Sequence, residues 1–185
     1  MLTSYILERF RLWPFLPTAL AMLAVAGNWR AFPLSVLLLL QFRLWDDLAD
    51  LRVDRVYQPQ RVMSRAVSAE PFIGAASILA VVCGALTAWS DYRKLIVLAG
   101  LSVLLLFWYR VRPCEFGLGY HVVLIKYPAF VYILSPAPSL RALLLVYFGA
   151  CAYEVLHDAE RRNLRTAQGA LVIVALLAVL LGVTH

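Results

Sequence analysis

Four aspartates and five arginines are concentrated in residues 41–65, at the end of a strongly apolar segment. If a helix that begins near Leu34 continues through this stretch, Asp46, Asp50 and Asp54 follow one another at intervals of four residues. Each then lies about 40° from the last on one helical face. Like charges at this spacing repel one another, so the acidic face requires a compensating cation. The alternative is a solvated helix end that neighbouring arginines compensate.

A second pair of carboxylates, Glu154 and Asp158, lies in the segment CAYEVLHDAERR and again has a spacing of four residues. If the chain forms an antiparallel helix bundle, the ends of both acidic segments can meet around one cavity. Mg²⁺ in proteins is commonly held by carboxylates together with phosphate oxygens of a substrate, and arginine suits bidentate contact with phosphate. These residue types therefore predict a site that binds a diphosphate through Mg²⁺.

The composition indicates which elements position these residues. The chain has 185 residues, is 63% hydrophobic and 15% charged, and has a mean hydropathy of +0.78. A soluble domain is about half apolar and about a quarter charged, so the excess of apolar residues predicts an integral membrane protein. The first apolar segment, 12–29, is interpreted as a retained helix and not as a signal peptide.

The sequence does not indicate a nucleic-acid partner, a disulfide framework or a zinc site. The arginines are expected at helix ends and not on a basic face, so nucleic acid is not an expected partner. Cys83, Cys114 and Cys151 show no CxxC or CxxH spacing, which argues against a disulfide framework and against a zinc site.

A transmembrane helix needs about 20 apolar residues, and several segments meet this requirement. We expect an all-α fold, a polytopic transmembrane bundle of about seven helices that forms a single domain over residues 1–185. The expected spans are 12–29, 33–50, 71–89, 94–110, 118–135, 139–157 and 167–184.

Lysine and arginine are distributed unevenly over the predicted loops. Only Arg30, Arg93, Lys94 and Arg141 fall on one side of the predicted membrane, and the other side holds most of the remaining cations. The positive-inside rule places the basic side in the cytoplasm. We therefore expect a multi-pass protein with a cytoplasmic N-terminus, a cytoplasmic site and an external C-terminus.

Five segments, in order, resemble the UbiA-type intramembrane prenyltransferase superfamily. RFRLWPFLP resembles the entry to its first helix, and Asp46-xxx-Asp50-xxx-Asp54 with the following Pro59-Gln60-Arg61 resembles its first acidic motif. FWYRVRP, Lys126-Tyr127-Pro128 and Glu154-xxx-Asp158 are similar to its tyrosine-basic, lysine and second acidic segments. Asp46 stands where the family has Asn, and Val62 where it has a second Pro. The family bundle has nine helices, two more than expected here.

This resemblance implies a Mg²⁺-dependent transfer of a prenyl group from a prenyl diphosphate to a lipophilic acceptor, typically an aromatic or quinone-precursor ring. Ionisation of the C–O bond gives an allylic cation, and the metal and arginines stabilise the leaving diphosphate. Membrane lipid surrounds such a site. The implied metal ligands are Asp46, Asp47, Asp50, Asp54, Glu154 and Asp158. The implied catalytic residues are Asp50, Asp54, Asp158 and Lys126, and the implied substrate-binding residues are Arg55, Arg61, Tyr109, Arg110, Arg112 and Lys126.

Other functions remain open on the sequence. A terpene cyclase of the same type would use the same ionisation but let a double bond of the substrate capture the cation. A non-catalytic membrane scaffold or a carrier of divalent ions would keep the carboxylates without the reaction. Because the expected helices are fewer than in the family, a homo-oligomer that completes the cavity wall is a further possibility.

Overall fold

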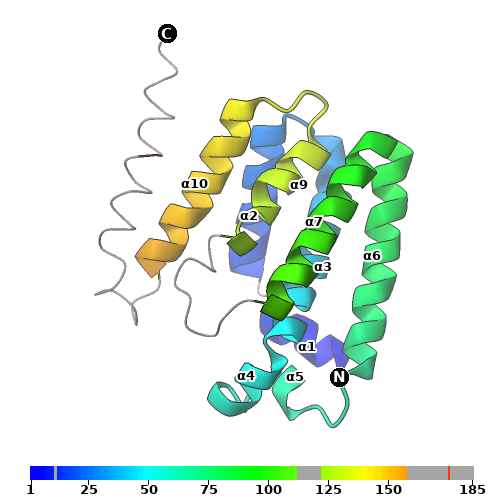
Figure 1. Ribbon diagram of the computed structural model, residues 1–185, viewed down its shortest axis with the longest axis vertical. Coiled ribbons are helices and arrows are strands. Elements are labelled where there is room, and N and C mark those ends of the chain that lie inside the picture. Colours follow the sequence, from blue (N-terminus) through cyan, green and yellow to red (C-terminus); the bar gives the residue numbers. More distant parts are fainter. Residues whose placement is uncertain (11, 112–121, 158–174, 176–185) are drawn as a thin grey trace. The chain divides into compact units, whose positions relative to one another are not determined.

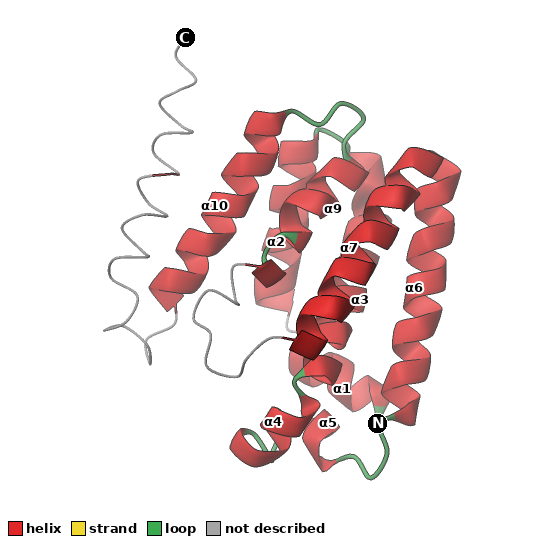
Figure 2. Ribbon diagram, viewed as in Figure 1, coloured by secondary structure: helices red, strands yellow, loops and turns green. Residues whose placement is uncertain are grey.

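A computed structural model describes residues 1–10, 12–111, 122–157 and 175. Within these ranges the regular structure is entirely helical, with no strand (Figures 1 and 2). The all-α prediction is therefore confirmed for the described residues. The chain divides into two compact units, residues 1–24 with 28–96 and residues 25–27 with 97–185. The assignment of residues 1–185 to a single domain stays a prediction.

The first unit contains a short N-terminal helix, several longer helices and two short helices that follow the acidic segment. The elements are α1 (Leu2–Arg9), most of α2 (Leu12–Ala26), η1 (Trp29–Ala31), α3 (Phe32–Ala49), α4 (Leu51–Tyr57), α5 (Val62–Arg65) and α6 (Glu70–Ser90). The most extensive packing in this unit joins α3 and α6, while α5 packs against both α4 and α1. In Figure 1 the short helices α1, α4 and α5 gather near one end of α3 and α6.

Glycine and proline determine where the longer helices begin and end. Gly27 has a φ of 66°, the left-handed conformation that glycine adopts readily, and it directly follows α2. Proline stands in the first turn of α3 and of α6, where a missing N–H costs no helical hydrogen bond. These residues separate the apolar helices with short connections.

The acidic segment is bent at Asp50. The helix α3 ends at Ala49 and α4 begins at Leu51, with Asp50 between them at φ −89° and ψ −2°. The expected span 33–50 is therefore close to α3, and the helix does not continue unbroken through Asp54. Aspartate is a weak residue for a helix interior because its side chain competes for backbone hydrogen bonds, and α4 also packs against α5. Asp46 therefore lies in α3, Asp54 lies in α4, and Asp50 lies at the bend between them.

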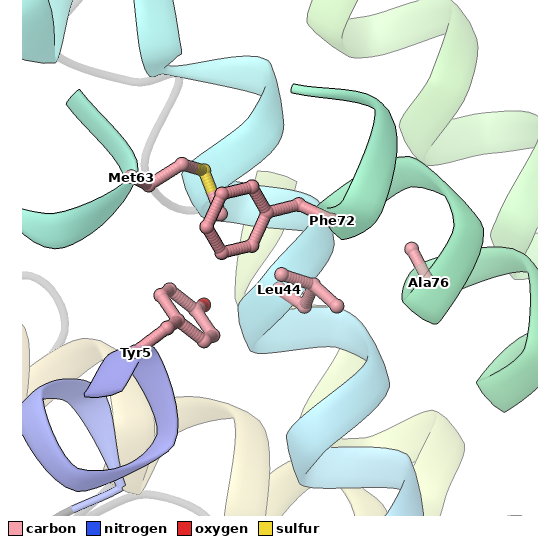
Figure 3. Close-up of a cluster of buried hydrophobic side chains, with 5 residues drawn as sticks. All are labelled: Tyr5, Leu44, Met63, Phe72 and Ala76. Atoms are coloured by element: carbon pink, nitrogen blue, oxygen red, sulfur yellow. The ribbon is translucent and has the colours of Figure 1, made fainter. Parts of the chain in front are cut away.

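A compact apolar cluster connects four helices of this unit. Tyr5 of α1, Leu44 of α3, Met63 of α5 and both Phe72 and Ala76 of α6 are buried together (Figure 3). The rings of Tyr5 and Phe72 meet edge to face, with their centroids 5.4 Å apart, a favoured aromatic geometry. The N-terminal helix α1 is thus packed against α3, α5 and α6.

The second unit contains most of α7 (Tyr92–Val111), α9 (Lys126–Leu134) and α10 (Leu140–His157). The helices α9 and α10 pack together, and Leu124, Cys151 and Ala152 form a small buried cluster. The expected span 118–135 is represented by the nine-residue α9. Residues 118–121 lie outside the described part of the chain, as do residues 167–184 apart from Ala175.

Within the described ranges, α6 and α7 are long and apolar enough to cross a membrane. Shorter apolar helices cover Phe15–Ala26 and Leu140–Tyr153. These elements support a membrane protein. The number of spans and their orientation stay predictions.

Candidate functional site

Asp47, near the end of α3, accepts hydrogen bonds from two side chains of α1. Tyr5 Oη donates to Asp47 Oδ2 over 2.8 Å, and Arg9 Nε donates to the same oxygen over 2.8 Å. Arg9 Nη2 also donates to Asp47 Oδ1 over 2.5 Å, which completes a bidentate pair. Arg43 Nη2 lies 3.5 Å from the same Oδ1. Both oxygens of this carboxylate therefore have partners.

Helical spacing explains why these groups converge. Tyr5 and Arg9 are four residues apart on α1, and Arg43 and Asp47 are four apart on α3, so each pair lies on one helical face. Tyr5 and Asp47 are buried, with exposed fractions of 2% and 6%. Burial, followed by the negative charge of Asp47, raises the pKa of the Tyr5 phenol well above its ordinary value. The phenol is consequently a persistent donor to the carboxylate.

Asp54 and Arg61 form an ion pair across the turn that follows α4. A backbone hydrogen bond from Arg61 N to Gln58 O, over 3.1 Å, closes this turn around Pro59. Asp54 is half-buried, while the neighbouring Arg55 is exposed. The turn therefore brings a guanidinium back onto the acidic segment.

Glu8 of α1 fixes the start of α5. Its Oε2 accepts a hydrogen bond from the backbone N–H of Val62 over 2.8 Å. The first N–H groups of a helix have no partner within the helix, so this carboxylate satisfies one of them. As a result, α1 contacts both sides of the acidic segment, through Asp47 before the bend and through α5 after it.

A small hollow lies among these groups, with space for about one water molecule. Its lining combines carboxylates, guanidiniums, a phenol and a thioether, contributed by Tyr5, Glu8, Arg9, Asp47, Asp54, Arg61 and Met63. Among the residues that the structure describes, no three acidic, histidine or cysteine side chains are grouped closely enough to hold a metal ion. The hollow is therefore a mixed-charge site in which carboxylates face arginines.

The expected first metal set is only partly gathered here. Asp47 and Asp54 line the hollow, while Asp46 and Asp50 are half-buried beside the bend. Asp47, an expected metal ligand, instead forms a hydrogen bond with Tyr5 and an ion pair with Arg9 of α1. The sequence did not suggest these contacts. Arg55 Nη2 donates to Ala66 O over 3.4 Å.

Sequence reasoning missed the contribution of α1. Tyr5, Glu8 and Arg9 all face the hollow, and none had been assigned a part in the site. Their spacing of three and four residues places them on one face of a short helix. A polar helical face just before the first apolar segment is the sequence feature that could have indicated their part in the site.

The remaining expected site residues belong to the second unit. Lys126 is buried at the start of α9, and its Nζ lies 5.6 Å from the centroid of the Tyr127 ring, a cation–π distance. Tyr109 is half-buried and Arg110 is exposed near the end of α7. Glu154 lies in α10, and Arg112 and Asp158 fall outside the described residues. The meeting of the two acidic segments stays a prediction.

No family model matches the chain, and neither a curated protein nor a solved structure matches it. The resemblance to UbiA-type prenyltransferases therefore rests on the five sequence segments.

Proposed function

We propose that the chain is a UbiA-type, Mg²⁺-dependent intramembrane prenyltransferase that acts on a prenyl diphosphate and a lipophilic acceptor. The observation that carries this proposal is the ion pair between Asp54 and Arg61. It joins the acidic segment to the Pro59-Gln60-Arg61 turn and puts a phosphate-binding cation beside a carboxylate suited to a metal. A diphosphate bound through Mg²⁺ needs both kinds of group next to each other.

The residue types fit magnesium, because carboxylates supply the oxygen ligands that this ion prefers. The proposed ligands are Asp46, Asp50 and Asp54 together with Glu154 and Asp158. When bound, Mg²⁺ would neutralise charge on the diphosphate. Asp47 is assigned a different part, since Arg9 and Tyr5 already occupy its oxygens. It would hold α1 in place and thereby position α5 and Arg61.

The cationic side chains of the chain itself would bind and stabilise the diphosphate. In this proposal Arg61 exchanges the Asp54 carboxylate for a phosphate oxygen, which frees Asp54 for the metal. Arg110, Arg112 and Lys126 would complete the set of phosphate contacts, with Tyr109 beside them. Arg55 is exposed and does not line the hollow, so it is left out of this set. Positive groups aimed at the leaving diphosphate lower the barrier to its departure.

One observation favours a non-catalytic protein. Asp54 and Arg61 already neutralise each other, as do Asp47 and Arg9, and such pairs also suit a scaffold or an ion-binding protein. A terpene cyclase shares every feature of the proposed site. Product analysis separates these three functions.

The test uses the full chain, purified and reconstituted into lipid nanodiscs with Mg²⁺ and radiolabelled prenyl diphosphates of several chain lengths. Each reaction is run with and without an extract of membrane lipids as a source of acceptors. Label transferred to an extract component supports the transferase. Label in a cyclic hydrocarbon or cyclic alcohol formed without the extract indicates a cyclase, and unchanged substrate in every reaction contradicts an enzyme.

A further inference from the structure

The outer face of α4 is amphipathic along its length. Its inward residues are Leu51 and Asp54, while Val53, Val56 and Tyr57 are exposed at 47%, 71% and 75%. At 100° per residue these three side chains span one contiguous sector of the helix. Together they form an apolar strip on the outer face of the helix.

Arginines flank this apolar sector on one side. Arg52 and Arg55 are both exposed, and the helical spacing puts them next to each other at the edge of the sector formed by Val53, Val56 and Tyr57. An apolar strip with basic residues along its border is the pattern of a helix that lies in the plane of a membrane interface. Tyrosine is also enriched at this depth.

Two other segments of the first unit, α1 and the connection between α5 and α6, also expose apolar side chains. Leu2, Ile6 and Leu7 project from the outer side of α1, and Val67 is fully exposed in the connection between α5 and α6. The chain continues from α1 almost directly into the apolar α2, and Val67 precedes the first residue of α6 by three positions. Short connections therefore tie these segments to the apolar α2 and to α6, which is long and apolar enough to cross a membrane.

We infer that α4 lies in the membrane interface, with Val53, Val56 and Tyr57 inserted among the lipids and Arg52 and Arg55 bound to anionic lipid headgroups. Anionic lipid complements the two exposed cations, and basic residues beside a membrane are attracted to such a surface. The inference depends on the amphipathic face of α4 and holds whether or not the chain transfers a prenyl group.

A protein partner fits this face less well. A stable protein interface buries about 800 Å² on each side, whereas α4 is seven residues and about 10 Å long. A lipid surface needs neither a matching shape nor a large contact area. The small size and the charge of the face thus favour lipid.

The test places an environment-sensitive fluorophore on Val56→Cys in a Cys114→Ser background, where Cys83 and Cys151 are buried. Full-length protein is reconstituted into nanodiscs of phosphatidylcholine alone or mixed with phosphatidylglycerol. Quenching by a lipid that carries a nitroxide near its headgroup is compared with quenching by acrylamide in the water. Arg52→Gln/Arg55→Gln is the test variant, and Arg93→Gln/Arg141→Gln removes two exposed cations elsewhere as the control.

We expect phosphatidylglycerol to increase quenching by the lipid nitroxide and to decrease quenching by acrylamide. The Arg52→Gln/Arg55→Gln variant should lose this difference between lipid compositions, and the control variant should keep it. Quenching that is dominated by acrylamide in both compositions would overturn the inference. So would a disulfide between Val56→Cys residues of two chains in the unlabelled variant, because a second copy would then cover the face.

Discussion

Arg9 of α1 and Asp47 of α3 are 38 residues apart in the sequence and form a bidentate ion pair with N–O distances of 2.8 and 2.5 Å. Both side chains are largely buried. The pair fixes the N-terminal helix against the acidic end of α3, on the side where Asp54 and Arg61 line the same hollow. It therefore connects the stability of the first unit to the geometry of the proposed site.

Replacing Arg9 by Met should destabilise the protein strongly. The change leaves the Asp47 charge buried without its bidentate partner, and breaking a buried pair from one side costs about 3 kcal/mol or more. Unfolding in mild detergent measures the loss. Arg43→Met is the control, because Arg43 is more exposed and 3.5 Å from the carboxylate, and its effect should be smaller. Equal stability of Arg9→Met and wild type would contradict this account of the pair.

Tyr5→Phe should lower stability at neutral pH and change its response to alkali. Loss of the hydrogen bond to Asp47 should cost roughly 1–3 kcal/mol. Because folding raises the Tyr5 pKa, the folded state keeps a proton that the unfolded phenol releases above about pH 10. This contribution is complete below that pH and is lost as the pH rises further.

The measurement is the melting temperature of wild type and Tyr5→Phe between neutral and strongly alkaline pH. Wild type should lose stability more steeply above about pH 10, so the gap between the two proteins should narrow. A gap that stays constant or widens at high pH would show that the Tyr5 phenol is not held in its protonated form.

Phe72→Ala should remove the centre of the apolar cluster that joins α1 to α6. Phe72 is completely buried against Tyr5, and truncation of such a side chain costs about 3–5 kcal/mol. Ile73→Ala is the matched control, because the adjacent Ile73 is 53% exposed. Unfolding of both variants in the same detergent compares them, and similar losses would argue against the cluster as a core.

Arg61→Gln should separate stability from the proposed activity. The pair with Asp54 is partly exposed, so its loss should change stability by about 1 kcal/mol or less. A contact with a diphosphate is worth more, and kcat/KM for the prenyl diphosphate should fall roughly tenfold to a hundredfold. Arg65→Gln, which removes an exposed arginine of α5, is the control. A normal kcat/KM in Arg61→Gln would remove Arg61 from the site.

The sequence predicted the helical class and most helix limits because apolar runs and prolines act locally. The expected segment 71–89 is close to α6, at Glu70–Ser90, and 94–110 is close to α7, at Tyr92–Val111. The expected span 33–50 also ends where α3 reaches the bend at Asp50. The separate helix α4 was not predictable from the apolar pattern, since it packs against α5.

For the site, residue types and short spacings suggested that the Asp54 segment and Arg61 belong together, and they do form an ion pair. The partner of Asp47 could not be found in the same way. Arg9 lies on a separate helix, and which of several carboxylates it meets depends on how α1 packs against α3 and α6. Long-range pairing of this kind follows from tertiary packing and leaves no fixed spacing in the sequence.

The release of pyrophosphate from a prenyl diphosphate by the purified, reconstituted chain tests the proposed function most directly. Release should require Mg²⁺ and should be abolished by Asp54→Asn, which keeps the size of the side chain but removes its charge. Glu70→Gln makes the same chemical change at an exposed carboxylate and should leave release unchanged. Equal release from wild type and Asp54→Asn, or no release that depends on Mg²⁺, would contradict the proposal.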